Sequence, residues 1–359
     1  MASPQNTPEV DDTDTESSAS DSGYSDAACS TESVTPSVYA FEERHGRTYH
    51  AYHAGKYMLP NDEGEQKRLD LQYHALRAVI GDRITYAPIV NPNGILDIGT
   101  GTGIWAINAA DAYPEALVIG TDLSPIQPRW VPPNLQFEVS DMDEPWAFSP
   151  ERFDLIHTRI MHGFGVSSWP DFYRQAFLCL SPGGWVENQE IDFQFRSDDD
   201  SLPQNSFMVE WARLWNHACE IRGETARCDP YRLKAQMEEE GFINTHIVSS
   251  KMPIGPWAMD PMLKQAGSWS HEALYTGVYG MSVALFKETL GWNETQLNHF
   301  LEGFRQELTR ESIHAYWTTA QYEEEVPTCK HVRVHGTCSI SEKYDEDFSY
   351  QAVLGNGWA

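Results

Sequence analysis

The stretch Ile95-Leu-Asp-Ile-Gly-Thr-Gly-Thr-Gly-Ile-Trp105 decides the fold of this chain. It begins with a short apolar strand at 95–98, carries an acid at Asp97, and enters a helix at Ile104. The segment between strand and helix holds three glycines spaced two apart: Gly99, Gly101 and Gly103. Glycine permits a tight turn and lets a ligand lie against the backbone, and a helix start offers free N–H groups. The stretch therefore predicts a ligand-binding loop.

The spacing of these glycines separates the loop from other nucleotide loops. A dinucleotide loop needs G-x-G-x-x-G, which counted from Gly99 would require glycine where Ile104 stands. Counted from Gly101, Ala106 is tolerable at the third position, but the tight-turn glycine then comes too late after the strand. A P-loop needs Gly-Lys-Ser/Thr, which is absent. An acid before G-x-G-x-G is instead typical of the class I S-adenosylmethionine (SAM) methyltransferases.

The chain around the loop alternates strands and helices, which indicates a parallel α/β sheet. Further strands are expected at 116–122, 135–139, 153–157, 185–191 and 242–250, and a turn at 181–184. Helices are expected at 104–111, 171–180, 203–222, 230–240, 281–290 and 294–310. The predicted fold class is therefore α/β: a Rossmann-like class I SAM-dependent methyltransferase with a mostly parallel seven-stranded sheet and flanking helices.

Composition divides the chain into four predicted segments. Residues 1–38 contain no Lys or Arg and few large apolar side chains, so they are expected to form a disordered acidic, Ser/Thr-rich tail. This tail either solubilises the protein or is phosphorylated or docks on a partner. Residues 39–90 are expected to form an N-terminal helical cap with a helix at 63–79, residues 91–250 the SAM-binding core, and residues 251–359 a C-terminal helical lid that completes the core.

Side chains at the ends of the next strands predict the rest of the cofactor site. Asp122 ends the second strand, where a carboxylate accepts hydrogen bonds from ribose hydroxyls, and Leu123 can pack on the adenine. After the third strand, Asp141 is expected to meet the adenine amino group. The predicted cofactor-binding set is Asp97, Gly99, Thr100, Gly101, Gly103, Asp122, Leu123, Asp141, Met142 and His157. The six cysteines show no metal-ligand spacing, so no metal is predicted.

The fourth strand ends in His157-Thr-Arg-Ile-Met-His162, at the sheet edge where ligands bind in such folds. Methyl transfer mainly needs alignment of the reactants, but a base helps if the acceptor is a hydroxyl or an amine. His162 is the first candidate base and His157 the second, and for each a structural role is the commoner meaning. Three acids lie near the fifth strand and are expected only to form local hydrogen bonds or to cap an element: Glu187, Glu190 and Asp192.

Two aromatic segments are candidates for closing the site. A Trp- and Met-rich tract is interpreted as core or as a substrate lid: Trp257, Met259, Met262, Trp269, Tyr275, Tyr279 and Met281. Four residues before the loop are candidates for covering the cofactor: Tyr49, His50, Tyr57 and Met58.

Motifs outside the loop resemble one family. They are Gly46-Arg-Thr-Tyr-His50, Leu59-Pro-x-Asp62 with Glu65, Arg68-Leu-Asp70, Tyr86-Ala-Pro88, Asp122-Leu-Ser-Pro-Ile-Gln-Pro128, Glu144-Pro-Trp146, Glu190-Ile-Asp-Phe193 and Ile313-His-Ala-Tyr316. From about residue 42 to residue 320 the chain resembles the fungal LaeA-like methyltransferases, the velvet-associated regulators of secondary metabolism and development. The resemblance implies SAM as cofactor, velvet-domain proteins as partners, a place in the nucleus and cytoplasm, and effects on transcription of biosynthetic clusters or on sporulation. Residues 157–163 depart from the family's pattern, so a shared methyl acceptor is not implied.

Three functions remain open from the sequence. The first is a LaeA-like regulator, the second an enzyme that tailors a secondary metabolite by O- or N-methylation, and the third a SAM-binding interaction module with little catalysis. The acceptor is accordingly a protein or a small molecule. A formal net charge of −28 argues against direct nucleic-acid binding. No apolar run is long enough to predict a membrane span.

Overall fold

The computed structural model describes residues 36–163, 165–203, 205–224 and 227–327. Most of the expected acidic tail at 1–38 lies outside these residues, as does the end of the chain from 328. The four segment boundaries therefore stay a prediction. Among the helices that the structure describes, none combines the length and the apolar character that crossing a membrane requires.

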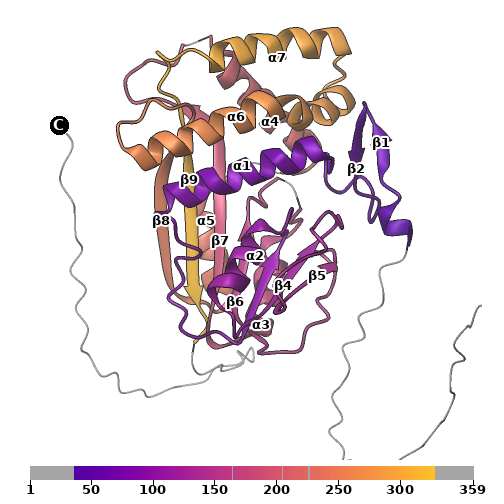
Figure 1. The fold of residues 1–359 in the computed structure, drawn as a ribbon, viewed down its shortest axis with the longest axis vertical. Coiled ribbons are helices and arrows are strands. Elements are labelled where there is room, and N and C mark those ends of the chain that lie inside the picture. The colour runs from indigo at the N-terminus through magenta and orange to yellow at the C-terminus, as the bar shows by residue number, and fades with distance from the viewer. Residues whose placement is uncertain (1–35, 164, 204, 225–226, 328–359) are drawn as a thin grey trace, which may run out of the picture.

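A seven-stranded sheet organises the protein (Figure 1). Its strands are β3 (Gly94–Ile98), β4 (Leu117–Asp122), β5 (Leu135–Val139), β6 (Phe153–Arg159), β7 (Leu180–Arg196), β8 (Ile243–Pro253) and β9 (Tyr316–Glu325). Their order is β5-β4-β3-β6-β7-β9-β8. The first five run parallel, whereas β9 pairs antiparallel with both β7 and β8. This sheet confirms the predicted class I methyltransferase fold.

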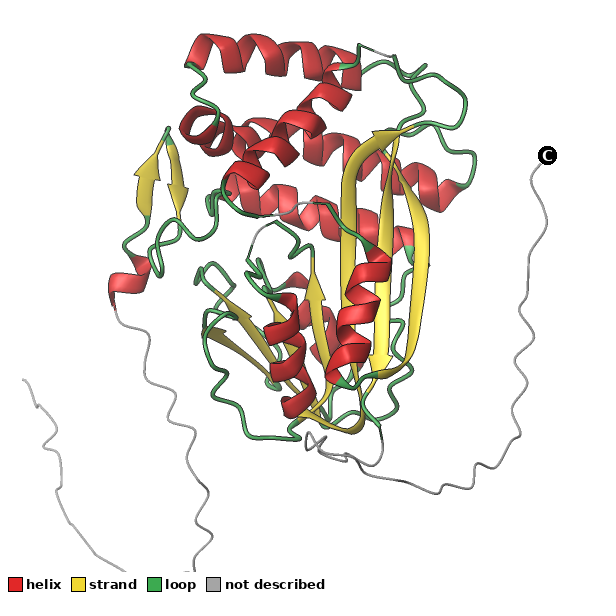
Figure 2. Ribbon diagram, turned by 180° about the vertical axis from the view of Figure 1, so that it is seen from behind, coloured by secondary structure: helices red, strands yellow, loops and turns green. Residues whose placement is uncertain are grey.

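Helices cover the sheet on both faces and beyond one end. They are α1 (Glu63–Val79), α2 (Ile104–Ala112), α3 (Trp169–Cys179), α4 (Phe207–Ile221), α5 (Pro230–Glu240), α6 (Pro261–Ala284), which runs into the π-helix η2 (Leu285–Thr289), and α7 (Glu294–Leu308). A 3-10 turn, η1 (Pro36–Tyr39), and a hairpin of β1 (Glu42–Arg44) and β2 (Arg47–Tyr49) precede α1. Figures 1 and 2 show α1, α4, α6 and α7 gathered beyond the carboxyl ends of the parallel strands.

Alternation along the strands divides the core between the two faces of the sheet. Ile95 belongs to an apolar cluster with α2, whereas Leu96 belongs to one with α3 and α5. A third and larger cluster joins the outer helices to the ends of β7, β8 and β9, and its centre contains the fully buried Trp211 and Trp215. The glycine loop after β3 therefore lies between a rigid sheet and a helical layer.

Three expectations about elements need correction. The turn expected at 181–184 lies inside β7, as an irregularity with Gly183 at φ +79°, so the strand begins at Leu180. The helix expected from residue 203 begins at Phe207, because the Ser206 hydroxyl accepts from the backbone N–H groups of Met208 and Val209 and caps it. The helix expected at 281–290 is the end of the much longer α6 and η2.

Candidate cofactor and active site

A cavity opens between the carboxyl edge of the sheet and α1. It encloses about 1260 Å³, part of it open to solvent. The glycine loop, the ends of β4 and β6, the loop after β5 and the inner face of α1 form its wall. This is the place where ligands bind in open α/β sheets, outside the carboxyl ends of the strands.

The glycine loop has a backbone that only glycine adopts readily. Gly99, Gly101 and Gly103 have φ values of +68°, +58° and +81°. A Cβ on Gly103 would come within 2.4 Å of the Phe137 ring, whereas a Cβ on Gly101 would meet only Leu69, at 3.7 Å. Gly103 is therefore required by packing, and Gly101 leaves space over the loop for a ligand.

Asp97 fixes the loop from below. Its Oδ2 accepts a hydrogen bond from Thr100 Oγ1 at 2.6 Å, and its Oδ1 lies 2.7 Å from His157 Nδ1. Asp97 and Thr100 both line the cavity and both are buried. Each oxygen of the Asp97 carboxylate therefore already has one partner within the protein.

Asp122 ends β4 at the cavity wall, as predicted. Its oxygens accept from the backbone N–H groups of Gly101 and Ser124, each at 2.9 Å. Burial raises the pKa of Asp122 to about 6, although these backbone hydrogen bonds lower it in part. Each carboxylate oxygen keeps further acceptor capacity, and Leu123 lies beside it in the wall. A diol-bearing ligand fits this arrangement.

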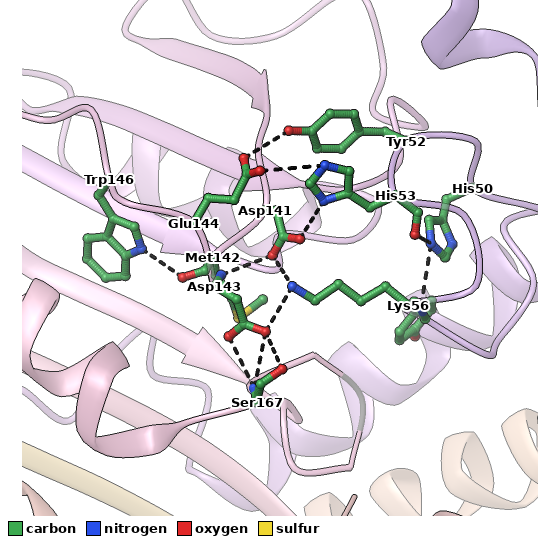
Figure 3. A network of polar contacts seen from close by, with 11 residues as sticks. His50, Tyr52, His53, Lys56, Asp141, Met142, Asp143, Glu144, Trp146 and Ser167 are labelled. Carbon is green, nitrogen blue, oxygen red and sulfur yellow. Dashed lines mark hydrogen bonds and ion pairs between the residues drawn. The ribbon is translucent and has the colours of Figure 1, made fainter. Parts of the chain in front are cut away.

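Asp141 faces a polar network rather than the cavity (Figure 3). His53 Nδ1 lies 2.7 Å from its Oδ2, and Lys56 contacts its Oδ1 and also Asp143, at 2.9 Å. Burial alone would raise the pKa of Asp141, but the hydrogen bonds from Lys56 and His53 lower it below its usual value. The carboxylate thus ties the 50–58 segment to the loop after β5, and Met142, next to it, is the residue that lines the cavity.

His157 lies at the floor of the cavity. Its ring stacks on Trp105, with ring centres 3.7 Å apart and planes within 1° of parallel. Its Nδ1 faces Asp97, and its Nε2 is buried without a hydrogen-bond partner. A histidine oriented by a carboxylate, with its second nitrogen free, has the arrangement of a general base.

His162 lies apart from the cofactor cavity. It stacks on Trp169 with ring centres 5.0 Å apart, and its Nδ1 is 3.7 Å from Glu190 Oε1. It lines a second cavity together with Lys56, Arg222, Arg227 and Arg232. The two predicted histidines therefore line two different cavities, and His157 is the one beside the glycine loop.

The turn after β6 has a strained backbone. Ile160 has φ +54°, which a β-branched residue rarely adopts. Its N–H donates to Gln189 O at 2.8 Å, and the buried Glu190 carboxylate accepts from the N–H groups of Met161 and His162, at 3.0 and 3.3 Å. Glu190 thus forms local hydrogen bonds, as expected, and these hold the turn in place.

The segment before the core forms the opposite wall. His50 and Tyr57 line the cavity, as expected, whereas Tyr49 and Met58 pack with Ala284 in a separate buried cluster. In the Trp- and Met-rich tract, only Met281 reaches the cavity. Trp269 packs against His74 with the two ring planes tilted by 38°, and Met259 is 97% exposed.

The sequence reasoning assigned no role to two residues that bear on the site. Asp70 on α1 accepts a hydrogen bond at 2.7 Å from Thr102, in the glycine loop. Arg159, the last residue of β6, lines the cavity. Arg159 follows the predicted fourth strand at the ligand-binding edge of the sheet, and its charge at that edge is the sequence signal for a role in the site. Among the described residues, no group of three or more His, Cys, Asp or Glu side chains is placed to hold a metal.

The cavity fits SAM in two independent respects. The glycine loop leaves room over Gly101, and Asp122 offers acceptors for a diol. This fold and this site define a class I SAM-dependent methyltransferase.

Comparisons with known proteins agree with that class and give the family. A methyltransferase domain model matches residues 72–247. The methyltransferase pytC of Aspergillus terreus is 42% identical over 81% of this chain and 89% of its own length. The secondary metabolism regulator laeA of Aspergillus fumigatus is 36% identical over 83% of this chain and 80% of its own length. The protein-methionine methyltransferase laeA of Emericella nidulans is 35% identical over 80% of this chain and 77% of its own length. The chain belongs to the LaeA-like methyltransferase family, and its cofactor is SAM.

Proposed function

We propose that this methyltransferase regulates fungal secondary metabolism and development, and that it works with velvet-domain proteins in the nucleus and cytoplasm. The segment at 46–70, which holds the first three of the family motifs, builds one wall of the cavity and binds the glycine loop through Asp70. This observation carries the proposal, because the part of the chain that resembles the regulators also shapes the site. Effects on transcription of biosynthetic clusters and on sporulation belong to the same proposal.

The proposed cofactor contacts follow the cavity wall. The loop from Gly99 to Gly103 lies under the ligand, Asp122 accepts from the ribose hydroxyls, and Leu123 and Met142 pack on the adenine. Asp97 and Thr100 shape the loop from below. Asp141 acts indirectly, since its carboxylate holds the 50–58 segment over the site through His53 and Lys56.

Bound SAM supplies a methyl group on a sulfonium sulfur, ready for in-line displacement. The chain's contribution is alignment and exclusion of water, by the apolar wall that includes Ile160 and Met161. An acceptor hydroxyl or amine must lose a proton, and His157, whose Nδ1 lies against Asp97, is the base that we propose for this step. A thioether acceptor has no proton to lose and needs no base.

We favour a protein acceptor, because the relative from Emericella nidulans is named a protein-methionine methyltransferase. The second candidate function is tailoring of a secondary metabolite at oxygen or nitrogen. The Asp97–His157 pair favours it, because such a base is needed for those acceptors and not for a thioether. A SAM-binding module with little catalysis is the third.

Transfer of label from methyl-labelled SAM distinguishes the three functions. The purified chain is incubated with fungal lysate, and label is counted in precipitated protein and in the small-molecule extract. Label in protein supports the regulator, label in small molecules supports the tailoring enzyme, and label in neither supports the module. Gly101→Arg is the control, because its side chain fills the cavity from a position with φ +58°. A tagged pulldown that recovers no velvet-domain protein counts against the proposed partners.

A further inference from the structure

Arg159 carries a guanidinium that the described part of the chain leaves without a counter-ion. It lines the cofactor cavity, and its Cζ lies 4.9 Å from the centre of the Tyr73 ring. Its Nε is buried without a hydrogen-bond partner. No carboxylate of the described residues forms an ion pair with it within 4.0 Å. Burial lowers the pKa of Arg159 below its ordinary value.

The nearby carboxylates are bound elsewhere. Asp97 accepts from Thr100 and faces His157, as described above. Glu187 accepts from Tyr86 N and Ala87 N, at 2.8 and 3.0 Å. Both attract Arg159 through space, but neither approaches it as a partner. Because a partly buried charge without a partner is costly, Arg159 is available to an anion that enters the cavity.

The position of Arg159 in the sheet indicates which anion it would bind. Asp122 ends β4, the glycine loop follows β3, and Arg159 ends β6, and these three strands are neighbours in the order β4-β3-β6. Asp122 and Arg159 are thus two strand spacings apart, roughly 10 Å. SAM carries its ribose and its α-carboxylate on opposite sides of the sulfur. A molecule with its ribose on Asp122 extends over the glycine loop toward Arg159.

The backbone after Arg159 is held in one conformation. Ile160 at φ +54° follows directly, and Gln189 O and the Glu190 carboxylate accept from residues 160–162. Residues in such sparsely populated conformations persist only where their surroundings hold them. The backbone from which Arg159 projects is therefore held in place before a ligand binds.

We propose that Arg159 binds the α-carboxylate of SAM through paired N–H···O hydrogen bonds. This proposal rests on SAM as the cofactor and on the ribose lying at Asp122. Guanidinium and carboxylate match in shape and charge, so such pairs are short and strong. Arg159 thereby fixes the end of the cofactor next to the methyl group.

Calorimetry with two matched ligands tests the proposal without relying on turnover. S-adenosylhomocysteine and its decarboxylated counterpart differ only in the carboxylate. The protein should bind S-adenosylhomocysteine roughly 10- to 100-fold more tightly, as expected for hydrogen bonds to charged groups. Arg159→Met should remove this preference by weakening S-adenosylhomocysteine alone. Arg159→Lys, which keeps the charge but not the paired geometry, should retain part of it.

Arg152→Met is the matched control, because Arg152 directly precedes the same strand at its opposite end. It should keep the full preference. A preference that survives in Arg159→Met overturns the proposal, as does equal binding of both ligands by the unaltered protein, which needs no variant to fold. Absence of heat with either ligand contradicts the SAM site as a whole, so the two failures are distinguishable. A loss of affinity for both ligands alike in Arg159→Met also overturns it.

Discussion

Asp122 is the residue whose ionisation should govern cofactor affinity. Burial raises its pKa to about 6, so the carboxylate is ionised above that pH and protonated below it. The ionised form offers acceptors to both ribose hydroxyls, and protonation removes one of them. The affinity for S-adenosylhomocysteine should therefore be constant above about pH 7 and fall toward tenfold per pH unit below pH 6.

The measurement is calorimetric titration between pH 5 and pH 8. Asp122→Asn should bind more weakly at pH 8 and show a shallower fall toward pH 5. Asp111→Asn, an exposed position on α2, should retain the slope of the unaltered protein. An equal slope in Asp122→Asn would assign the titration to another group.

At the scale of single residues, the sequence predicts which residues lie near the cavity better than it predicts which way their side chains face. Gly99, Gly101, Asp122, Leu123, Met142 and His157 all lie in the cavity wall, because strand order brings their elements to one edge, whereas Gly103 packs on Phe137 instead. Asp141 was placed at the right loop but faces Lys56 and His53. Its orientation depends on a segment 85 residues earlier, and no local pattern reports such a contact.

At the scale of elements, α1 and α6 pack through glycine. Arg68 on α1 is buried, pairs with Glu65 at 2.7 Å and lies beside Gly277 of α6. A Cβ on Gly277 would come within 2.3 Å of Arg68 Cδ, and one on Gly280 within 2.4 Å of an Arg47 nitrogen. Gly277 thus permits the close approach of α1, the helix that forms the cavity wall, and Gly280 permits that of the Arg47 side chain on β2.

Gly277→Ala should destabilise the protein. The added methyl group must displace a side chain that is held by a buried ion pair, and overpacking of this kind costs about 1–3 kcal/mol. Urea unfolding measures the change, with Thr276→Ala as control, since Thr276 is the exposed neighbour on α6 and should change stability by less than about 0.5 kcal/mol. A gain in stability, as helix propensity alone would give, would contradict the packing argument.

A helix or strand can be predicted from the sequence where the residues that determine it lie within or next to it. The helix at 63–79 was predicted with its bounds, because Asp62 caps it by accepting from Glu65 N at 3.1 Å. The strand β9 at 316–325 was not predicted. Its sequence, Tyr-Trp-Thr-Thr-Ala-Gln-Tyr-Glu-Glu-Glu, ends in three acids, and it forms a strand because β7 and β8 hold it on both sides. Such pairing is tertiary and has no local signature.

At the scale of the whole molecule, β9 joins the last third of the chain to the core, and Glu323 makes that junction sensitive to pH. Glu323 lies opposite Glu187 on β7 and His246 on β8. Burial, and then the charge of Glu187, raise its pKa to about 7, although Arg83 lowers it in part. The unfolded chain should titrate near 4.5, the ordinary value. Between these two pH values the folded protein holds one proton more, so its stability should fall as pH rises from 4.5 to 7 and then stay constant.

Glu323→Gln should remove this dependence, because the amide mimics the protonated carboxyl and carries no charge at any pH. At pH 5 the variant and the unaltered protein should differ little, whereas at pH 8 the variant should be more stable by on the order of 2 kcal/mol, after allowing for partial solvent screening. Urea unfolding at both pH values measures the difference. Glu325→Gln is the control, since Glu325 lies two positions further along β9 and accepts from Asn244 at 2.8 Å. If Glu323→Gln gave the same change at both pH values, Glu323 would not be the titrating group.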